Sequence, residues 1–278
     1  MANYTAADIK ALREQTGAGM MDVKKALDEA DGDNAKATEV LRVKGLKGVT
    51  KREGRSASNG LVRVDVSNGV GTLVEINCET DFVAKGEKFS ALADQVMAQA
   101  VATEATTSEE LLSSDMGGRS VQAVLDEANA TIGEKIEVRR VARLGAPDGG
   151  SVVSYLHKTS PDLPAQIGVL VASQGGEDGL ARDIAMHVAA FSPTVLSRDE
   201  IDEDTVAKER RIAEETAREE GKPEQALPKI IEGRVNGFFK ENVLLDQAFA
   251  KDSKKSVAQV AKEGGVEVTS FVRFKVGV

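Results

Sequence analysis

The stretch Gly60-Leu-Val-Arg-Val-Asp-Val-Ser-Asn-Gly-Val-Gly-Thr-Leu-Val-Glu-Ile76 decides the core fold of this chain. Valine stands at every second position from Val62 to Val66, which is typical of a β-strand that buries one face. Ser67-Asn-Gly69 follows, and Asn and Gly tolerate the positive φ angles of a tight hairpin turn. Apolar residues return at 70–76. The stretch therefore predicts two antiparallel strands.

The order strand, turn, strand and helix occurs twice along the chain. The second strands match as Gly71-Thr-Leu-Val and Gly168-Val-Leu-Val, and the helices match as Leu92-Ala-Asp-Gln-Val-Met and Leu180-Ala-Arg-Asp-Ile-Ala. Such self-similarity predicts a duplicated α+β unit. Gly71 lies 21 positions before Leu92, whereas Gly168 lies 12 positions before Leu180, so the first copy holds nine extra residues.

The extra residues include Asp81 and Phe82, within Asn77-Cys-Glu-Thr-Asp-Phe-Val-Ala-Lys-Gly86. Only 10 of the 278 residues are Phe or Tyr, and the chain has no Trp, so an aromatic in a polar segment needs a reason. Aromatic anchors that are buried in an interface contribute much of its binding energy. The alternative is that Phe82 folds back over the following helix. The shorter second copy favours a function, because the scaffold does not require the insertion.

Composition limits the classes of function. A net charge of −9 argues against a protein whose main partner is bare nucleic acid. The first residues lack a secretory signal, and no apolar run reaches membrane-spanning length. A single cysteine, Cys78, excludes an intrachain disulfide and fits a reducing compartment. The two histidines and the cysteine lie far apart, so no metal site and no cofactor are expected. We expect a cytoplasmic protein.

Outside the repeat, the sequence predicts helical units. Residues 1–55 indicate a compact three-helix domain, whose third helix loosens at Gly45 and Gly48 and leads into a linker from Lys47 to Asn59. A basic cluster in this linker could touch RNA, but a solvated linker is the simpler interpretation. The predicted units are 1–55 for this domain and linker, 56–145 for the first α+β subdomain, 146–196 for the first part of the second, 197–236 for a helical hairpin, and 237–278 for the part that completes the second subdomain.

The hairpin prediction depends on local signals. Ser197-Arg-Asp-Glu200 is a capping box that precedes a highly charged helix reaching Glu220. Gly221-Lys-Pro223 predicts a turn, with Pro223 at the first position of the next helix. Two helices joined by a short turn indicate an antiparallel hairpin that projects from the body. The alternative is one solvated helix that lies on the surface.

Several motifs extend over essentially the whole chain: Leu12-Arg-Glu-Gln-Thr-Gly-Ala-Gly-Met-Met-Asp-Val-Lys-Lys-Ala-Leu27, Asn77-Cys-Glu-Thr-Asp-Phe-Val-Ala84, Ile184-Ala-Met-His-Val-Ala-Ala190, Glu232-Gly-Arg234 and Phe271-Val-Arg-Phe274. In this order they closely resemble the elongation factor Ts family, the guanine-nucleotide exchange factors of elongation factor Tu. The resemblance implies an α+β fold with an N-terminal ubiquitin-associated-like domain, two repeated subdomains with antiparallel strands, and a projecting coiled-coil hairpin.

The resemblance also implies a function without bond-making chemistry. Elongation factor Tu, in its GDP-bound and nucleotide-free states, would be the partner, with no direct nucleic-acid or membrane contact and no cofactor. Family roles transfer to positions that match the motifs. The segment pushed toward the magnesium site of the GTPase would be Thr80, Asp81, Phe82 and Val83. Residues contacting the partner would be Arg13, Met20, Met21 and His187.

Taken alone, some of these residues have simpler interpretations, and some neighbours depart from the family pattern. Methionines such as Met20 and Met21 usually fill core gaps, and a histidine such as His187 is more often a half-buried helix residue. Gln15 and Val23 stand where the family has arginine and cysteine. Glu79 replaces a glutamine and adds a negative charge beside the key segment. The chain ends at Val278, soon after the last motif, whereas some members continue into a further helix.

Two other classes of function compete. An enzyme could use Glu79 and Asp81 as acid–base groups or metal ligands, but no nucleophile–base pair, glycine-rich phosphate loop or histidine spacing accompanies them. A non-catalytic adaptor could use the N-terminal helical domain to bind ubiquitin-like partners, although fold does not set function. Recovery of nucleotide-free elongation factor Tu in a pull-down, and its release by GDP, would separate an exchange factor from an adaptor.

Overall fold

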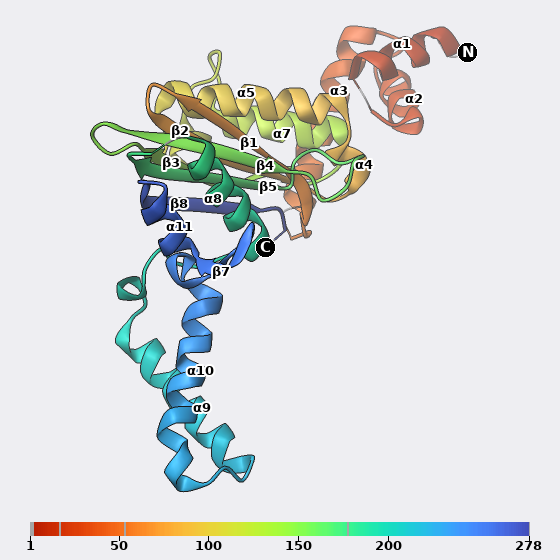
Figure 1. Cartoon of the computed structure of the whole chain (residues 1–278). Helices are drawn as coiled ribbons and strands as arrows, with labels where there is room; N and C mark the ends of the chain where they lie inside the picture. Colours follow the sequence, from red (N-terminus) through yellow and green to blue (C-terminus); the bar gives the residue numbers. More distant parts are fainter. Residues whose placement is uncertain (1–2, 17, 53, 177, 278) are drawn as a thin grey trace.

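The computed structural model describes residues 3–16, 18–52, 54–176 and 178–277. Two antiparallel sheets lie at the centre, helices cover their outer faces, and a pair of long helices projects at one end (Figure 1). The fold therefore belongs to the mixed α+β class. In the described part of the chain, no helix combines the length and the apolar character needed to cross a membrane.

The first sheet has the order β1-β2-β3, with β1 (Asn59–Ser67), β2 (Val70–Cys78) and β3 (Glu137–Gly145) running antiparallel. Asn68 and Gly69 have φ angles of 52° and 75°, so the predicted hairpin turn is confirmed. β2 is the central strand, and every residue after Val70 is buried. Burial on both faces favours apolar residues, and all of β2 except Thr72, Glu75 and Asn77 is apolar or glycine.

Helices cover the outer face of this sheet. They are α4 (Asp81–Ala84), α5 (Glu87–Thr103), α6 (Ser108–Ser113) and α7 (Val121–Ile132). The sequence predicts that Phe89, Leu92, Val96 and Ala100 share the inner face of this helix, and the prediction is confirmed because all four are buried. Their helical spacing places them in one stripe against the sheet.

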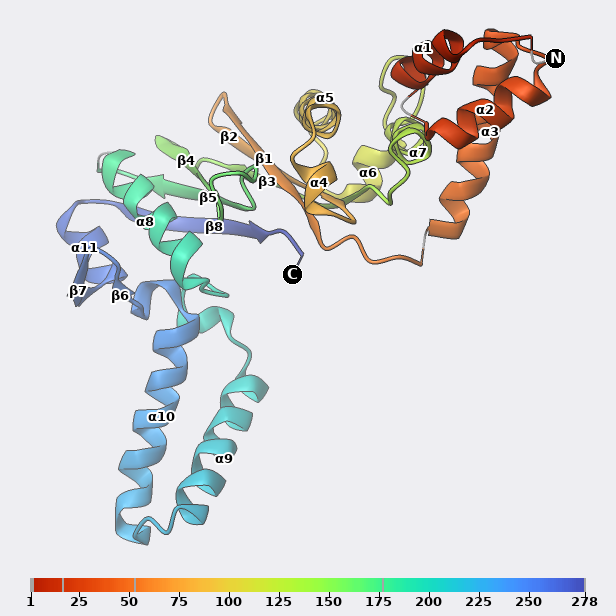
Figure 2. The same cartoon turned by 90° about the vertical axis from the view of Figure 1, so that its right-hand side faces the viewer.

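The second sheet repeats this topology with the order β4-β5-β8: β4 (Gly150–His157), β5 (Ile167–Gln174) and β8 (Glu267–Lys275). Its central strand is again the second strand of a hairpin, and α8 (Asp178–Phe191) packs on its outer face. The remaining small elements lie beside this sheet: β6 (Ala248–Phe249), β7 (Asp252–Ser256) and α11 (Val257–Glu263). Figure 2 shows helices outside both sheets and the sheets between them.

The two sheets meet through one glycine from each central strand. A Cβ atom on Gly71 would lie 2.7 Å from Cδ2 of Leu170, and one on Gly168 would lie 2.7 Å from Cδ1 of Leu73. Each strand therefore carries Gly-x-Leu, and each leucine fills the space left by the glycine of the other sheet. This reciprocal packing explains why the repeated units share that motif and why a side chain is excluded at both glycines.

The repeats differ after the central strand. β5 ends at Gln174 and α8 begins at Asp178, whereas β2 ends at Cys78 and α5 begins at Glu87. The first connection contains the short helix α4, within the polar segment that holds the extra residues. The extra residues of the first copy thus add one helical turn to the surface.

The N-terminal unit consists of α1 (Ala6–Thr16), α2 (Met20–Glu29) and α3 (Asn34–Arg52), with Leu12 and Leu27 in its core. The linker predicted from Lys47 is partly wrong, because α3 continues through Gly45 and Gly48 to Arg52. Each glycine costs a helix only ~1 kcal/mol, and α3 also packs against α7, which outweighs that cost. The sequence also predicts that Gly17 and Gly19 interrupt the first helix. Gly17 lies outside the described residues, and Gly19 is the N-cap residue of α2.

Two long helices, α9 (Glu203–Glu219) and α10 (Leu227–Asn242), lie side by side and extend away from the sheets (Figure 2). The predicted capping box at Ser197 is confirmed, but it caps the short 3₁₀ turn Arg198–Glu200, and Asp202 caps α9. The position predicted for Pro223 is wrong. Pro228, not Pro223, stands in the first turn of α10. Capping signals are local, so they do not reveal which of two consecutive helical segments is the long one.

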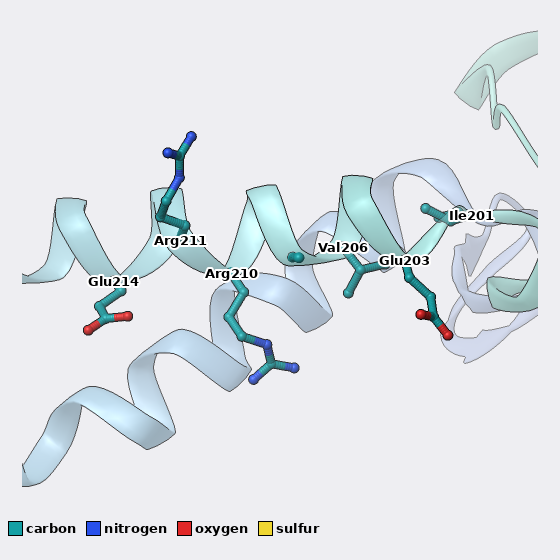
Figure 3. A pocket seen from close by; sticks show the side chains of 7 residues that line it. Ile201, Glu203, Val206, Arg210, Arg211 and Glu214 are labelled. Atoms are coloured by element: carbon teal, nitrogen blue, oxygen red, sulfur yellow. The ribbon is translucent and has the colours of Figure 1, made fainter.

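A shallow hollow on α9 has a largely charged lining. Arg210 and Glu214 extend on the side of α9 where α10 lies, whereas Arg211 extends on the opposite side (Figure 3). The buried contacts between the helices come from small or apolar residues, including Ala213, Ala217 and Leu227. The projecting pair is thus held by a thin apolar seam with charged flanks.

Candidate functional site

The short helix α4 presents an aromatic side chain to solvent. Thr80 is its N-cap residue, and its hydroxyl accepts a hydrogen bond from the backbone N–H of Val83 at 3.4 Å. Phe82 follows in the first turn and is 83% exposed, the highest value among the large apolar side chains described. The alternative in which Phe82 folds over the next helix is therefore excluded.

Asp81, at the first position of α4, forms an ion pair with Lys85 one turn later. Lys85 Nζ lies 2.8 Å from Asp81 Oδ2. The hydrogen bond from Lys85 holds the pKa of Asp81 below its usual range, and Asp81 in turn raises the pKa of Lys85. Both side chains are therefore charged at neutral pH, and the face beside Phe82 carries a carboxylate with its own counter-ion.

Glu79 does not lie on the exposed face. Its carboxylate accepts a hydrogen bond from the backbone N–H of Lys135 at 2.6 Å and lies 3.3 Å from Arg55 Nη1. Its side chain is 19% exposed. Glu79 was expected to add a negative charge next to Asp81. Its carboxylate instead points toward Lys135 and Arg55, and Arg55 offsets its charge.

Cys78 closes β2 directly before this segment. Its side chain is fully buried, and the thiol donates a hydrogen bond to the carbonyl of Thr80 at 3.2 Å. Burial raises the pKa of the thiol to about 12. Because the thiolate is the reactive species, Cys78 is inert at neutral pH and serves packing.

The N-terminal unit contributes a second exposed surface. Met20 and Met21 are 59% and 62% exposed, so neither methionine is a core residue. A groove on this surface is lined by residues that include Arg13 and Met20 of the N-terminal unit and Lys88 of α5. Lys88 lies at the start of the helix that follows α4, so this groove spans the N-terminal unit and the α4–α5 region.

His187 is not part of either exposed surface. It has no accessible area; its Nε2 lies 2.8 Å from Gln247 Oε1, and its Nδ1 accepts from the backbone N–H of Ala250 at 3.1 Å. This pattern requires the neutral ring, and burial lowers the pKa of His187 accordingly. Its ring stacks on Phe191 at 4.6 Å, and Phe191 is the exposed aromatic of this region.

The sequence analysis missed Glu134, which contacts the segment before α4. Its carboxylate accepts hydrogen bonds from the backbone N–H groups of Glu79 and Thr80 and from the Thr80 hydroxyl. A single acidic residue 54 positions from Thr80 gives no sequence signal of such a contact. Within the described residues, no group of three His, Cys, Asp or Glu side chains is arranged to hold a metal ion.

Comparisons with known proteins agree with the motifs. Residues 79–278 match the family model described as elongation factor TS. Elongation factor Ts from Micrococcus luteus is 62% identical over 280 residues, that from Beutenbergia cavernae 62% over 283, and that from Pseudarthrobacter chlorophenolicus 60% over 280; each match covers all of both chains. Full-length identity of this size leaves no alternative family. The chain therefore belongs to the elongation factor Ts family of translation elongation factors.

Proposed function

We propose that this chain binds elongation factor Tu·GDP and promotes release of GDP by disturbing the magnesium site of that GTPase, after which GTP can bind. One observation supports this above all others. The segment that carries the family motif presents Phe82 to solvent, 83% exposed, in a chain with few aromatic residues. An exposed aromatic on a braced turn is suited to enter a crevice of another protein.

The energetics of exchange explain why no bond-making chemistry is needed. A GTPase holds its nucleotide partly through Mg²⁺, which bridges phosphate oxygens. A protein that binds the nucleotide-free state more tightly than the GDP-bound state weakens GDP binding by the same factor. Each ~1.4 kcal/mol of such coupling changes affinity about tenfold.

Residues of α4 divide the work in this proposal. Phe82 is the anchor that enters the partner, with Thr80 and Val83 forming the turn that carries it. Asp81 is charged at neutral pH and forms an ion pair with Lys85. When α4 approaches the partner, the carboxylate of Asp81 can interact with the groups that bind the partner's metal ion and so weaken their hold on it. In this role Asp81 lies next to the magnesium site and does not bind the metal ion itself.

Other surfaces would hold the partner while α4 acts. The groove with Arg13 and Met20, together with Met21, is suited to an apolar and charged counterpart on the GTPase. His187 is buried, so we assign it an indirect role, in which it supports the exposed ring of Phe191. We further propose that the N-terminal unit is ubiquitin-associated-like, that α9 and α10 form a coiled-coil hairpin, and that the domains divide as predicted from the sequence. We also propose that the protein acts in the cytoplasm and has no nucleic-acid partner.

The test is release of fluorescent GDP from elongation factor Tu, stimulated by this chain and by the variants Phe82→Ala and Asp81→Ala. Loss of a desolvated aromatic anchor costs ~2 kcal/mol, which corresponds to about a thirtyfold slower stimulated release for Phe82→Ala. Val66→Ala is the matched control, since Val66 is an exposed apolar residue at the far hairpin of the first sheet. Undiminished stimulation by both α4 variants would rule the proposal out.

A further inference from the structure

The junction between β2 and α4 is closed by side chains where strand pairing ends. The last ladder pair of β2 and β3 is Asn77 with Glu137. Beyond it, the backbone N–H groups of Glu79 and Thr80 donate to Oε2 of Glu134 at 3.1 and 3.0 Å. In return, the backbone N–H of Lys135 donates to Oε1 of Glu79 at 2.6 Å. Two carboxylates thus replace the missing ladder bonds in a reciprocal arrangement.

Glu134 also controls the cap of α4. The hydroxyl of Thr80 donates to Oε1 of Glu134 at 2.6 Å. A hydroxyl has one hydrogen, so this bond fixes its rotation and leaves its lone pairs free to accept from the N–H of Val83. Hydrogen bonds to an ionised acceptor are stronger than neutral ones. The carboxylate of Glu134 therefore orients the group that caps α4.

α4 depends on this support because it is short. It spans only Asp81–Ala84, and isolated helices of this length are unstable in water. Phe82 adds little packing within its own chain, since most of its surface is exposed. The position of the ring is thus set by the backbone of the turn, and Glu134 is the residue that makes three hydrogen bonds to the start of that turn.

We propose that Glu134 is a positioning residue for nucleotide exchange, which holds α4 so that Phe82 enters the partner without first being ordered. This inference rests on the function proposed above for Phe82. A turn that samples several conformations must lose that freedom on insertion, and only the fraction in the right geometry is competent. Glu134 acts through Thr80 and Phe82 and has no contact with the partner of its own.

The experiment measures stimulated release of fluorescent GDP from elongation factor Tu as a function of the concentration of the full-length variant. Glu134→Ala removes three hydrogen bonds and is expected to lower the maximal rate at least tenfold, since one hydrogen bond to a charged group contributes about 1.5–3 kcal/mol. The half-saturating concentration changes less than threefold, because the docking groove is intact. Glu134→Gln keeps the side-chain length and one acceptor oxygen, so it restores part of the rate and serves if Glu134→Ala does not fold.

A double-mutant cycle with Phe82→Ala separates this role from general damage. In the Phe82→Ala background, Glu134→Ala should have no further effect, because the group it positions is gone. Glu137→Gln is the matched control, because Glu137 lies three residues after Glu134, at the start of β3, and forms an ion pair with Lys135. It should stimulate GDP release at the parental rate. Amide exchange of Thr80 should be at least tenfold faster in Glu134→Ala, with the amides of β2 unchanged.

The outcomes distinguish the two proposals. Suppose that Phe82→Ala stimulates GDP release slowly, as expected. The role of Glu134 is then overturned if folded Glu134→Ala reaches the parental maximal rate. It is also overturned if Glu134→Ala lowers the maximal rate by the same factor with and without Phe82. If Phe82→Ala itself stimulates release at the parental rate, the function proposed for α4 fails first.

Discussion

Removing the guanidinium of Arg140 is predicted to destabilise the fold far more than removing an exposed charge. Glu75 lies in the central strand β2 and has no accessible surface. Arg140 Nε donates to its Oε2 at 2.7 Å, and Arg140 Nη2 donates to the carbonyl of Lys275 at 3.0 Å. The guanidinium also lies 4.5 Å from the ring centroid of Phe274. Arg140 therefore connects the first sheet to the strand that completes the second.

The magnitude follows from what Arg140→Ala leaves behind. Among the described residues, the carboxylate of Glu75 would keep only the N–H of Gly277, at 3.3 Å, as a hydrogen-bond donor. Breaking a buried pair from one side costs about 3–5 kcal/mol, and we expect the lower end because Arg140 is 35% exposed. If the stranded charge is the cause, Glu75→Gln in the same chain should recover part of the loss.

The assay is urea-induced unfolding followed by circular dichroism, for Arg140→Ala, Glu75→Gln and the double variant. Lys255→Ala is the control, because Lys255 and Glu263 form an exposed ion pair; its midpoint should stay close to the parental one. A loss below ~1 kcal/mol for Arg140→Ala, or a double variant less stable than Arg140→Ala alone, would refute this reasoning.

Three further outcomes are expected. Gly71→Val lowers the free energy of unfolding by about 1–3 kcal/mol in urea denaturation, because its Cβ enters the space of Leu170, whereas Gly145→Val, with open space, does not. Burial raises the pKa of Cys78 to about 12, so its thiol should resist thiol reagents until the chain unfolds. Because the unfolded thiol ionises from pH ~8.5, the free energy of unfolding should fall between pH ~8.5 and 12, and Cys78→Ala should remove this slope. Burial lowers the pKa of His187, so its contribution to stability is present above pH ~6.5 and is lost on acidification. In thermal melts, the melting temperature of His187→Gln should therefore fall less on acidification than that of the parental chain. An equal fall would contradict the neutral ring.

Much of the core could be predicted because its signals are local or periodic. Asn68-Gly69 defined the hairpin turn, and the Gly-x-Leu motifs of the two central strands marked the repeat. The burial of His187 also had a signal, since Ile184, His187 and Val188 follow helical spacing, and all three are buried. The family resemblance implied that His187 contacts the partner, whereas its position alone favoured a half-buried helix residue, which is closer to the observed burial.

Other features depend on contacts that the sequence does not encode locally. The extension of α3 past Gly45 and Gly48 combines weak local penalties with packing against α7. The exposure of Phe82 is a result of where α4 sits, and the contact of Glu134 with Thr80 spans 54 positions. Single acidic residues are common in any chain, so their partners become visible only in three dimensions.

The central claim is that binding of this chain and binding of GDP oppose each other through Phe82. The most direct measurement is the affinity of the chain for elongation factor Tu by calorimetry, without nucleotide and with saturating GDP. We expect at least tenfold weaker binding with GDP, and we expect Phe82→Ala to bring the two affinities close together. Equal affinities for the parental chain with and without GDP would contradict the central claim.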